Sequence, residues 1–131
     1  MNQDEQHLDL LKIFYFVFAG LQALGGCIPI VHLSLGLAMI TGKFPGKSGD
    51  PAPEMFGWFF VVIAVVLMTV IWTTAALTYS AGRRLAERRS HTFCLVVAAV
   101  LCMFMPIGTL LGVFTIVVLQ RPSVKARFGV A

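Results

Sequence analysis

Charge is scarce in this chain of 131 residues, and three long stretches lack it altogether. Charged residues make up 12% of the sequence, about half the share found in soluble domains, whereas hydrophobic residues make up 58%. No formally charged residue occurs in Ile13 to Gly42, Met55 to Gly82 or Ser90 to Gln120. Roughly 20 apolar residues in a helix cross the ~30 Å hydrocarbon core of a bilayer, so each stretch is long enough to span it. The pattern excludes an ordinary soluble domain, whose surface helices are apolar on one face only.

Further absences narrow the class of function. The three segments lack the Asp, Glu, Lys or Arg that marks a proton-coupled transporter, and this absence also weakens a hydrolase interpretation. The only cysteines, Cys27, Cys94 and Cys102, lie inside apolar segments and do not suggest a secreted disulfide framework. The start carries Asp4 and Glu5 instead of the basic region of a cleaved signal peptide, so we expect the first segment to be retained. We therefore expect neither an enzyme nor a bound cofactor.

The uncharged stretches predict an all-α integral membrane protein with a single transmembrane domain over residues 1–131. Its hydrophobic segments cover about 12–41, 55–81 and 91–120. Each is expected to form one long helix, and Pro29 and Pro106 are expected to kink the first and the third. The alternative is four crossings, in which the third segment turns back as a hairpin at Pro106.

Lysine and arginine counts test the orientation through the positive-inside rule. With three crossings the two sides of the membrane carry five cations each. With a hairpin the C-terminal tail rejoins the second polar break, and the count becomes eight against two. In a third alternative, which explains the equal counts, the protein inserts in both orientations and pairs antiparallel. The sequence leaves these topologies open.

His32 is the one ionisable side chain deep within a segment. It is a candidate axial ligand for haem or a metal, because Cys27 lies nearby and Cys102, Met103 and Met105 could supply sulfur ligands. Haem between two helices usually needs two histidines at matching depth, and one chain supplies one. A structural histidine that bonds a carbonyl near Pro29 is the favoured interpretation, and no metal is assigned.

Threonines recur along the second segment, mostly on one side of the predicted helix. They predict either a polar stripe that lines a pore or hydroxyl groups that bond to neighbouring carbonyls, and the second interpretation is favoured. The candidate pore-lining residues are Thr69, Thr73, Thr74 and Thr78.

Small residues spaced by four mark faces on which helices can approach closely. Such faces hold one chain together or join copies of it, so they make a homo-oligomer a reasonable expectation. The candidate helix-packing residues are Gly108, Gly112, Ala19, Ala23, Ser34 and Ala38.

Four arginines cluster in the second polar break and are expected to contact anionic lipid headgroups. They are Arg83, Arg84, Arg88 and Arg89. The net charge of +4 is ordinary for a membrane protein, and no stacking platform accompanies it, so nucleic acid is not an expected partner.

The C-terminal part carries three short motifs, Thr92–Cys94 (TFC), Pro106–Ile116 (PIGTLLGVFTI) and Arg121–Lys125 (RPSVK). It resembles a group of small uncharacterised bacterial inner-membrane proteins that share P-x-G-T-x-L-G-V-F-T-I followed by R-P-x-V-K. The resemblance covers about the last forty residues and only loosely the first segment. It implies a multi-pass protein of the bacterial inner membrane, and it implies no activity.

These observations predict a non-enzymatic integral membrane protein that acts through helix packing. It would work as a homo-oligomer or as an accessory subunit of a membrane complex, with lipids and membrane proteins as partners. The alternative is a small homo-oligomeric channel lined by the threonines. A haem- or metal-binding redox subunit through His32 is the third class.

Overall fold

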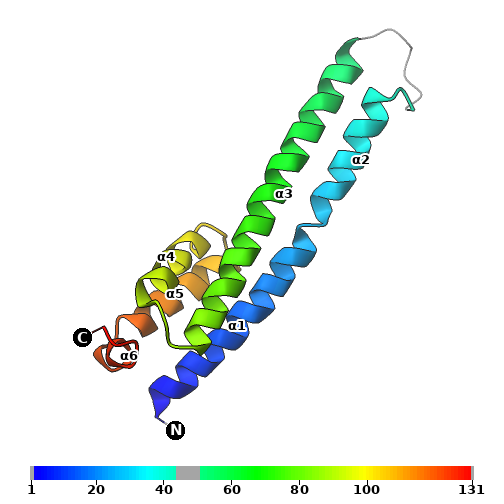
Figure 1. Cartoon of the computed structure of the whole chain (residues 1–131). Coiled ribbons are helices and arrows are strands. Elements are labelled where there is room, and N and C mark those ends of the chain that lie inside the picture. Colours follow the sequence, from blue (N-terminus) through cyan, green and yellow to red (C-terminus); the bar gives the residue numbers. More distant parts are fainter. Residues whose placement is uncertain (1, 44–50, 131) are drawn as a thin grey trace. The chain divides into compact units, whose positions relative to one another are not determined.

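The computed structural model describes residues 2–43 and 51–130, and these residues form helices joined by short turns. The predicted all-α class is confirmed, and no strand occurs in the described part of the chain. The helices are α1 (Gln3–Gly25), α2 (Ile28–Ile40), α3 (Pro51–Ala86), α4 (His91–Leu101), α5 (Ile107–Leu119) and α6 (Pro122–Arg127) (Figure 1).

The first uncharged segment contains two helices, α1 and α2, which only Gly26 and Cys27 separate. Pro29 lies in the first turn of α2, where its missing N–H costs nothing because first-turn N–H groups have no partner within the helix. The sequence predicts a kink at Pro29 within one long helix; the structure interrupts the helix just before the proline instead. Gln3–Ile40 together are long and apolar enough to cross a membrane.

Helix α3 is continuous over 36 residues, or about 54 Å at 1.5 Å per residue. It extends beyond the uncharged stretch and carries Arg83 and Arg84 in its last turn. Its residues Glu54–Ala86 form the second stretch that is long and apolar enough to cross a membrane.

The third segment is not the single kinked helix that we expected. Its two short helices, α4 and α5, turn back on each other through residues 102–106. The Thr109 hydroxyl donates to the Cys102 carbonyl at 2.8 Å within this turn, and His91 Nε2 lies 2.8 Å from the Leu119 carbonyl oxygen at the open end. Pro106 cannot continue α4, and two glycines of α5 allow close packing against α4. The hairpin alternative at Pro106 describes this part of the structure.

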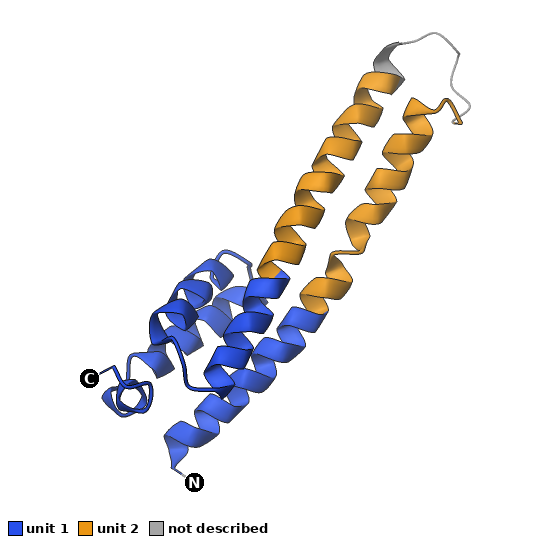
Figure 2. Cartoon of the chain, viewed as in Figure 1, with its two compact units in different colours: residues 1–20, 75–131 blue, residues 21–74 orange. Residues whose placement is uncertain are grey.

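The chain forms two compact units, and their boundaries fall within helices (Figure 2). Unit 1 contains residues 1–20 and 75–131, and unit 2 contains residues 21–74. Helices α1 and α3 contribute residues to both units. Unit 1 buries one hydrophobic cluster, formed by Leu8, Leu11, Tyr15, Ala81, Leu85, Cys94, Val97, Leu101, Leu111, Val118, Leu119 and Val124.

Glycines set the helix contacts in unit 1. A Cβ atom at Gly108 would lie 2.5 Å from the Leu101 carbonyl oxygen, and one at Gly112 would overlap the Ala98 carbonyl oxygen. On the other side of the unit, a Cβ at Gly82 would lie 3.2 Å from the Tyr15 Cβ. Helix α5 thus approaches the backbone of α4 more closely than any residue with a side chain allows.

Unit 2 has its own glycine contact, between α2 and the first half of α3. A Cβ at Gly36 would lie 2.8 Å from the Gly57 carbonyl oxygen, and one at Gly57 would lie 3.0 Å from the Gly36 carbonyl oxygen. Nearer the start of the unit, the indole nitrogen of Trp72 occupies the space beside Gly26, 2.8 Å from where a Cβ would be. Unit 2 is therefore a helix pair that packs through backbone contact.

The glycine contact of the hairpin gives a first prediction. Gly112→Ala should destabilise the protein by about 1–3 kcal/mol, because the added methyl group overlaps the Ala98 carbonyl and the Cys102 sulfur. Gly20→Ala is the matched control, since nothing lies within 4 Å of its Cβ position, and there the change should be neutral or stabilising by about 0.5–1 kcal/mol. Denaturant unfolding in mild detergent, followed by circular dichroism, measures both. Equal effects of the two variants would contradict the tight hairpin contact.

Candidate functional site

The most extensive surface feature is the apolar exterior of the two long helical stretches. Little of their apolar part is buried inside the protein: 17% of an 18-residue apolar segment of Gln3–Ile40, and 11% of such a segment of Glu54–Ala86. A core helix of a soluble protein would be mostly buried. Large apolar side chains instead remain open, with Leu24 71%, Ile28 65% and Met55 67% exposed. This exterior requires an apolar environment, and the stretches are suited to insertion in a membrane.

The tip of the α4–α5 hairpin is apolar and open as well. Met103 is 83% exposed, Met105 is 84% exposed, and Leu110 in the first turn of α5 is 74% exposed. No charged residue accompanies them between Ser90 and Gln120. A hairpin with this tip can enter hydrocarbon without burying a charge.

The opposite end of unit 1 is charged and joins both ends of the chain. Arg121 Nη1 lies 3.0 Å from Asp4 Oδ1, and the Ser123 hydroxyl donates to Asp4 Oδ2 at 2.6 Å. These two contacts, from Ser123 first and Arg121 second, hold the pKa of the Asp4 carboxyl below its usual value. Asp4 precedes the uncharged stretch by two turns, outside the part of α1 that would lie in hydrocarbon.

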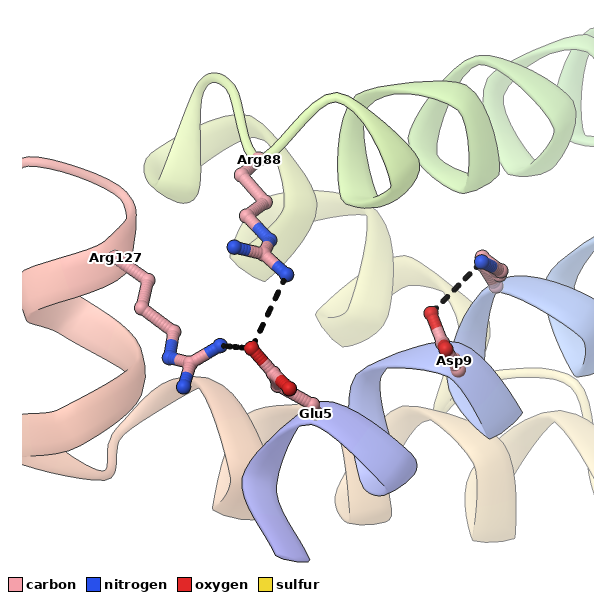
Figure 3. Close-up of polar contacts among 5 residues, drawn as sticks. Glu5, Asp9, Arg88 and Arg127 are labelled. Carbon is pink, nitrogen blue, oxygen red and sulfur yellow. Dashed lines mark hydrogen bonds and ion pairs between the residues drawn. The ribbon is translucent and has the colours of Figure 1, made fainter. Parts of the chain in front are cut away.

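Two arginines, Arg88 and Arg127, face Glu5 at the same end (Figure 3). Arg127 Nη1 donates to Glu5 Oε1 at 2.5 Å, and Arg88 Nη2 lies 3.8 Å from the same oxygen. The hydrogen bond from Arg127 and its positive charge lower the pKa of Glu5. The contacts of Asp4 and Glu5 thereby tie α1 to α6 and to the α3–α4 turn; we call them the terminal clasp.

The four arginines at the end of α3 and in the α3–α4 turn have different partners. Arg88 joins the terminal clasp, while Arg83 in the last turn of α3 lies 3.4 Å from Glu87, which follows the helix. Arg84 bonds Ser90 and covers the ring of Phe93. For Arg89, the described part of the chain offers no ion pair. Their predicted contact with lipid headgroups stays a prediction.

The predicted helix-packing residues are distributed over different surfaces. Gly108 and Gly112 lie against α4 within the chain, and Ala19 is 7% exposed in unit 1. In unit 2, Ala23 and Ala38 are half-buried and Ser34 is exposed. A role of these residues in assembly stays a prediction.

Sequence reasoning missed three packing glycines, Gly36, Gly57 and Gly82. Gly36 and Gly57 have no small residue four positions away, whereas Gly82 has Thr78 and Ala86 at that spacing. Gly36 is nevertheless flanked by Ser34 and Ala38, and Gly57 is a lone small residue among aromatic side chains. A glycine surrounded by large apolar residues is a usable signal of a close helix contact.

The threonines of α3 occupy two faces instead of one. Thr69 and Thr73 are exposed, and their hydroxyl groups donate to the carbonyls of Val65 and Thr69 at 2.8 Å and 2.6 Å. Thr74 and Thr78 are buried, and Thr74 donates to the Val70 carbonyl at 2.9 Å. This is back-bonding to the preceding turn, so only the first pair presents a polar surface to the exterior.

His32 lies in unit 2 with its ring stacked on Phe60, at 6.2 Å between ring centroids. Its Nδ1 is buried and meets no hydrogen-bond partner among the described residues. Cys27 is exposed in the same unit, whereas Cys102, Met103 and Met105 belong to unit 1. No group of three metal-binding side chains occurs in residues 2–43 and 51–130.

Comparison of the chain with protein-family models, with curated proteins and with solved structures finds no match. The functional argument therefore depends on the chain's own residues.

The terminal clasp predicts a specific acid dependence. A lowered pKa means that Glu5 stabilises the fold at neutral pH and that this contribution disappears as the pH falls below about 5 through the folded-state pKa. Glu5→Gln should lower the melting temperature at pH 7 and flatten its fall toward acid pH. Thermal unfolding in detergent over a pH series measures this change.

Glu87→Gln is the matched control for Glu5→Gln, because Glu87 pairs, among the described residues, only with the nearby Arg83, and both side chains are exposed. We expect it to leave the melting temperature and its pH profile nearly unchanged. A pH profile that is the same in both variants would contradict a stabilising clasp.

Proposed function

We propose that this chain is a non-enzymatic integral protein of the bacterial inner membrane that acts through helix packing, as a homo-oligomer or as an accessory subunit of a membrane complex. The observation that carries the proposal is the open, uncharged apolar exterior of the two long helical stretches. Such surfaces are stable only against lipid or against other apolar helices.

The proposed topology is two full crossings and a hairpin that enters the membrane part-way. Helices α4 and α5, with 11 and 13 residues, are roughly 17 Å and 20 Å long, which is short of the ~30 Å core. The hairpin also returns the C-terminal tail to the side of the arginines, which favours one fixed orientation with eight cations in the cytoplasm. These are Lys12, Arg83, Arg84, Arg88, Arg89, Arg121, Lys125 and Arg127. Of the two remaining cations, Lys47 lies outside the described residues.

Assembly follows from the same exterior. Ser34 and Ala38 lie two residues on either side of Gly36, so helix geometry places them nearly opposite the face of α2 that packs on α3. They present small side chains to the exterior of unit 2, where a second helix can approach closely. Gly108 and Gly112 are already used within the hairpin, so their substitution reports on folding more than on assembly.

Native mass spectrometry of the protein in lipid discs tests this function by counting subunits and co-purifying chains. The wild type should give one defined oligomer or a hetero-complex, and Ser34→Leu with Ala38→Leu should shift it toward smaller species. Ala99→Leu on the exposed face of α4 is the matched control and should leave the subunit count unchanged. A strictly monomeric wild type without partners would refute the proposal.

A pore is the second candidate, and the exposed pair Thr69 and Thr73 favours it. In an oligomer, this pair could line a polar path between copies. Thr73→Val should then reduce ion flux into liposomes several-fold, while Thr78→Val, at a fully buried position, should act only through stability. Absence of flux for common ions at high protein density would exclude the pore.

A further inference from the structure

A polar hollow of about 220 Å³ lies at the turn between α3 and α4, lined by Arg84, Glu87, Arg89 and Ser90. A neighbouring hollow of about 210 Å³ is lined by Ser80, Arg83, Arg84 and Glu87. Arg84 and Glu87 border both. The first hollow is smaller than the ~300–1,000 Å³ of sites for drug-sized ligands, so it is suited to one small polar group.

Arg84 is held in position by two contacts. Its Nη1 donates to Ser90 Oγ at 2.9 Å, and its guanidinium carbon lies 4.2 Å from the centroid of the Phe93 ring. The cation–π contact and the hydrogen bond fix the plane of the guanidinium group and leave its other N–H groups available. Because Ser90 Oγ accepts from Arg84, its own hydroxyl hydrogen is also available to a ligand.

The remaining charges around the hollow leave an excess of positive charge. Arg89 forms no ion pair within residues 2–43 and 51–130, and the one acid, Glu87, already faces Arg83 at 3.4 Å. Arg88 is turned toward Glu5 and takes part in the terminal clasp. Arg88 thus contributes to the terminal clasp, while Arg84 and Arg89 line the hollow.

We propose that this hollow binds a phosphate group, with Arg84, Arg89 and the Ser90 hydroxyl as its donors. Guanidinium groups bind phosphate oxygens through paired, charge-assisted hydrogen bonds, which matches a preset Arg84. The hollow follows directly after Ala86, where the second membrane-suited stretch ends, so it lies at headgroup depth in the proposed topology. The phosphodiester of an anionic lipid is the expected source, and free phosphate shares the same chemistry.

This inference rests on the proposed membrane location, and its test separates the two. The full-length protein is placed in discs of phosphatidylcholine and phosphatidylglycerol, and native mass spectrometry measures which lipid stays bound. Incorporation into the discs reports on membrane insertion, independently of lipid preference. In parallel, thermal unfolding in detergent is measured with and without inorganic phosphate.

We expect preferential retention of phosphatidylglycerol, reduced about tenfold by Arg89→Gln and by Arg84→Lys. Arg84→Lys is informative because it keeps the positive charge and removes the planar guanidinium group that can donate two parallel hydrogen bonds. Lys125→Gln is the matched control, since it removes one cation from the same unit away from the hollow, and it should cost at most about fivefold.

Stabilisation by inorganic phosphate that Arg89→Gln abolishes would support the same site with a soluble source. Equal losses in all three variants, or a loss in Arg84→Lys no greater than that in Lys125→Gln, would overturn the proposal in favour of diffuse surface charge. Absence of both lipid preference and phosphate stabilisation in the wild type would overturn it as well.

Discussion

The close backbone contact between α5 and α4 is the constraint on which unit 1 depends. Gly108 and Gly112 let α5 lie directly against the carbonyl groups of α4, and this contact turns the third segment back on itself. Only for that reason do Arg121 and Arg127 reach Asp4 and Glu5 at the first turn of α1. Helix packing in the apolar part and ion pairing in the polar part thus act together: Val124 of α6 joins the buried cluster that includes Leu8 of α1, and the ion pairs add polar contacts between the same helices.

The two units share one physical solution with different consequences. In each unit, helices approach at glycines until their backbones are in van der Waals contact, as helices that associate in an apolar environment do. In unit 2 the outward-facing side chains are largely apolar and exposed. Unit 1 adds a charged end, where Arg88 pairs with Glu5, while Arg84 and Arg89 line the proposed phosphate site. Four arginines at the end of α3 and in the turn after it thus need not have one role.

Some expectations followed directly from the chain's chemistry, and others failed for identifiable reasons. The all-α class and a distortion of the helix near Pro29 were predictable, because absence of charge and a missing N–H are local properties. The single third helix was wrong, because Pro106 permits either a kink or a reversal, and the choice depends on what α5 packs against. The threonines divided between two faces because spacings of four and one residues alternate along α3. Gly36 and Gly57 were missed because each shows its role only when the other is opposite it.

The sequence by itself determined that this protein has long uncharged helical stretches suited to a membrane, because transfer of apolar and charged groups between water and lipid depends on residue type alone. Tertiary structure alone decided that the third segment is a hairpin, that the termini meet in a clasp, and that Arg84 is fixed over Phe93 beside Ser90. These features bring together residues far apart in the chain or on successive helices, and contacts of that kind depend on complementary surfaces that no local pattern encodes.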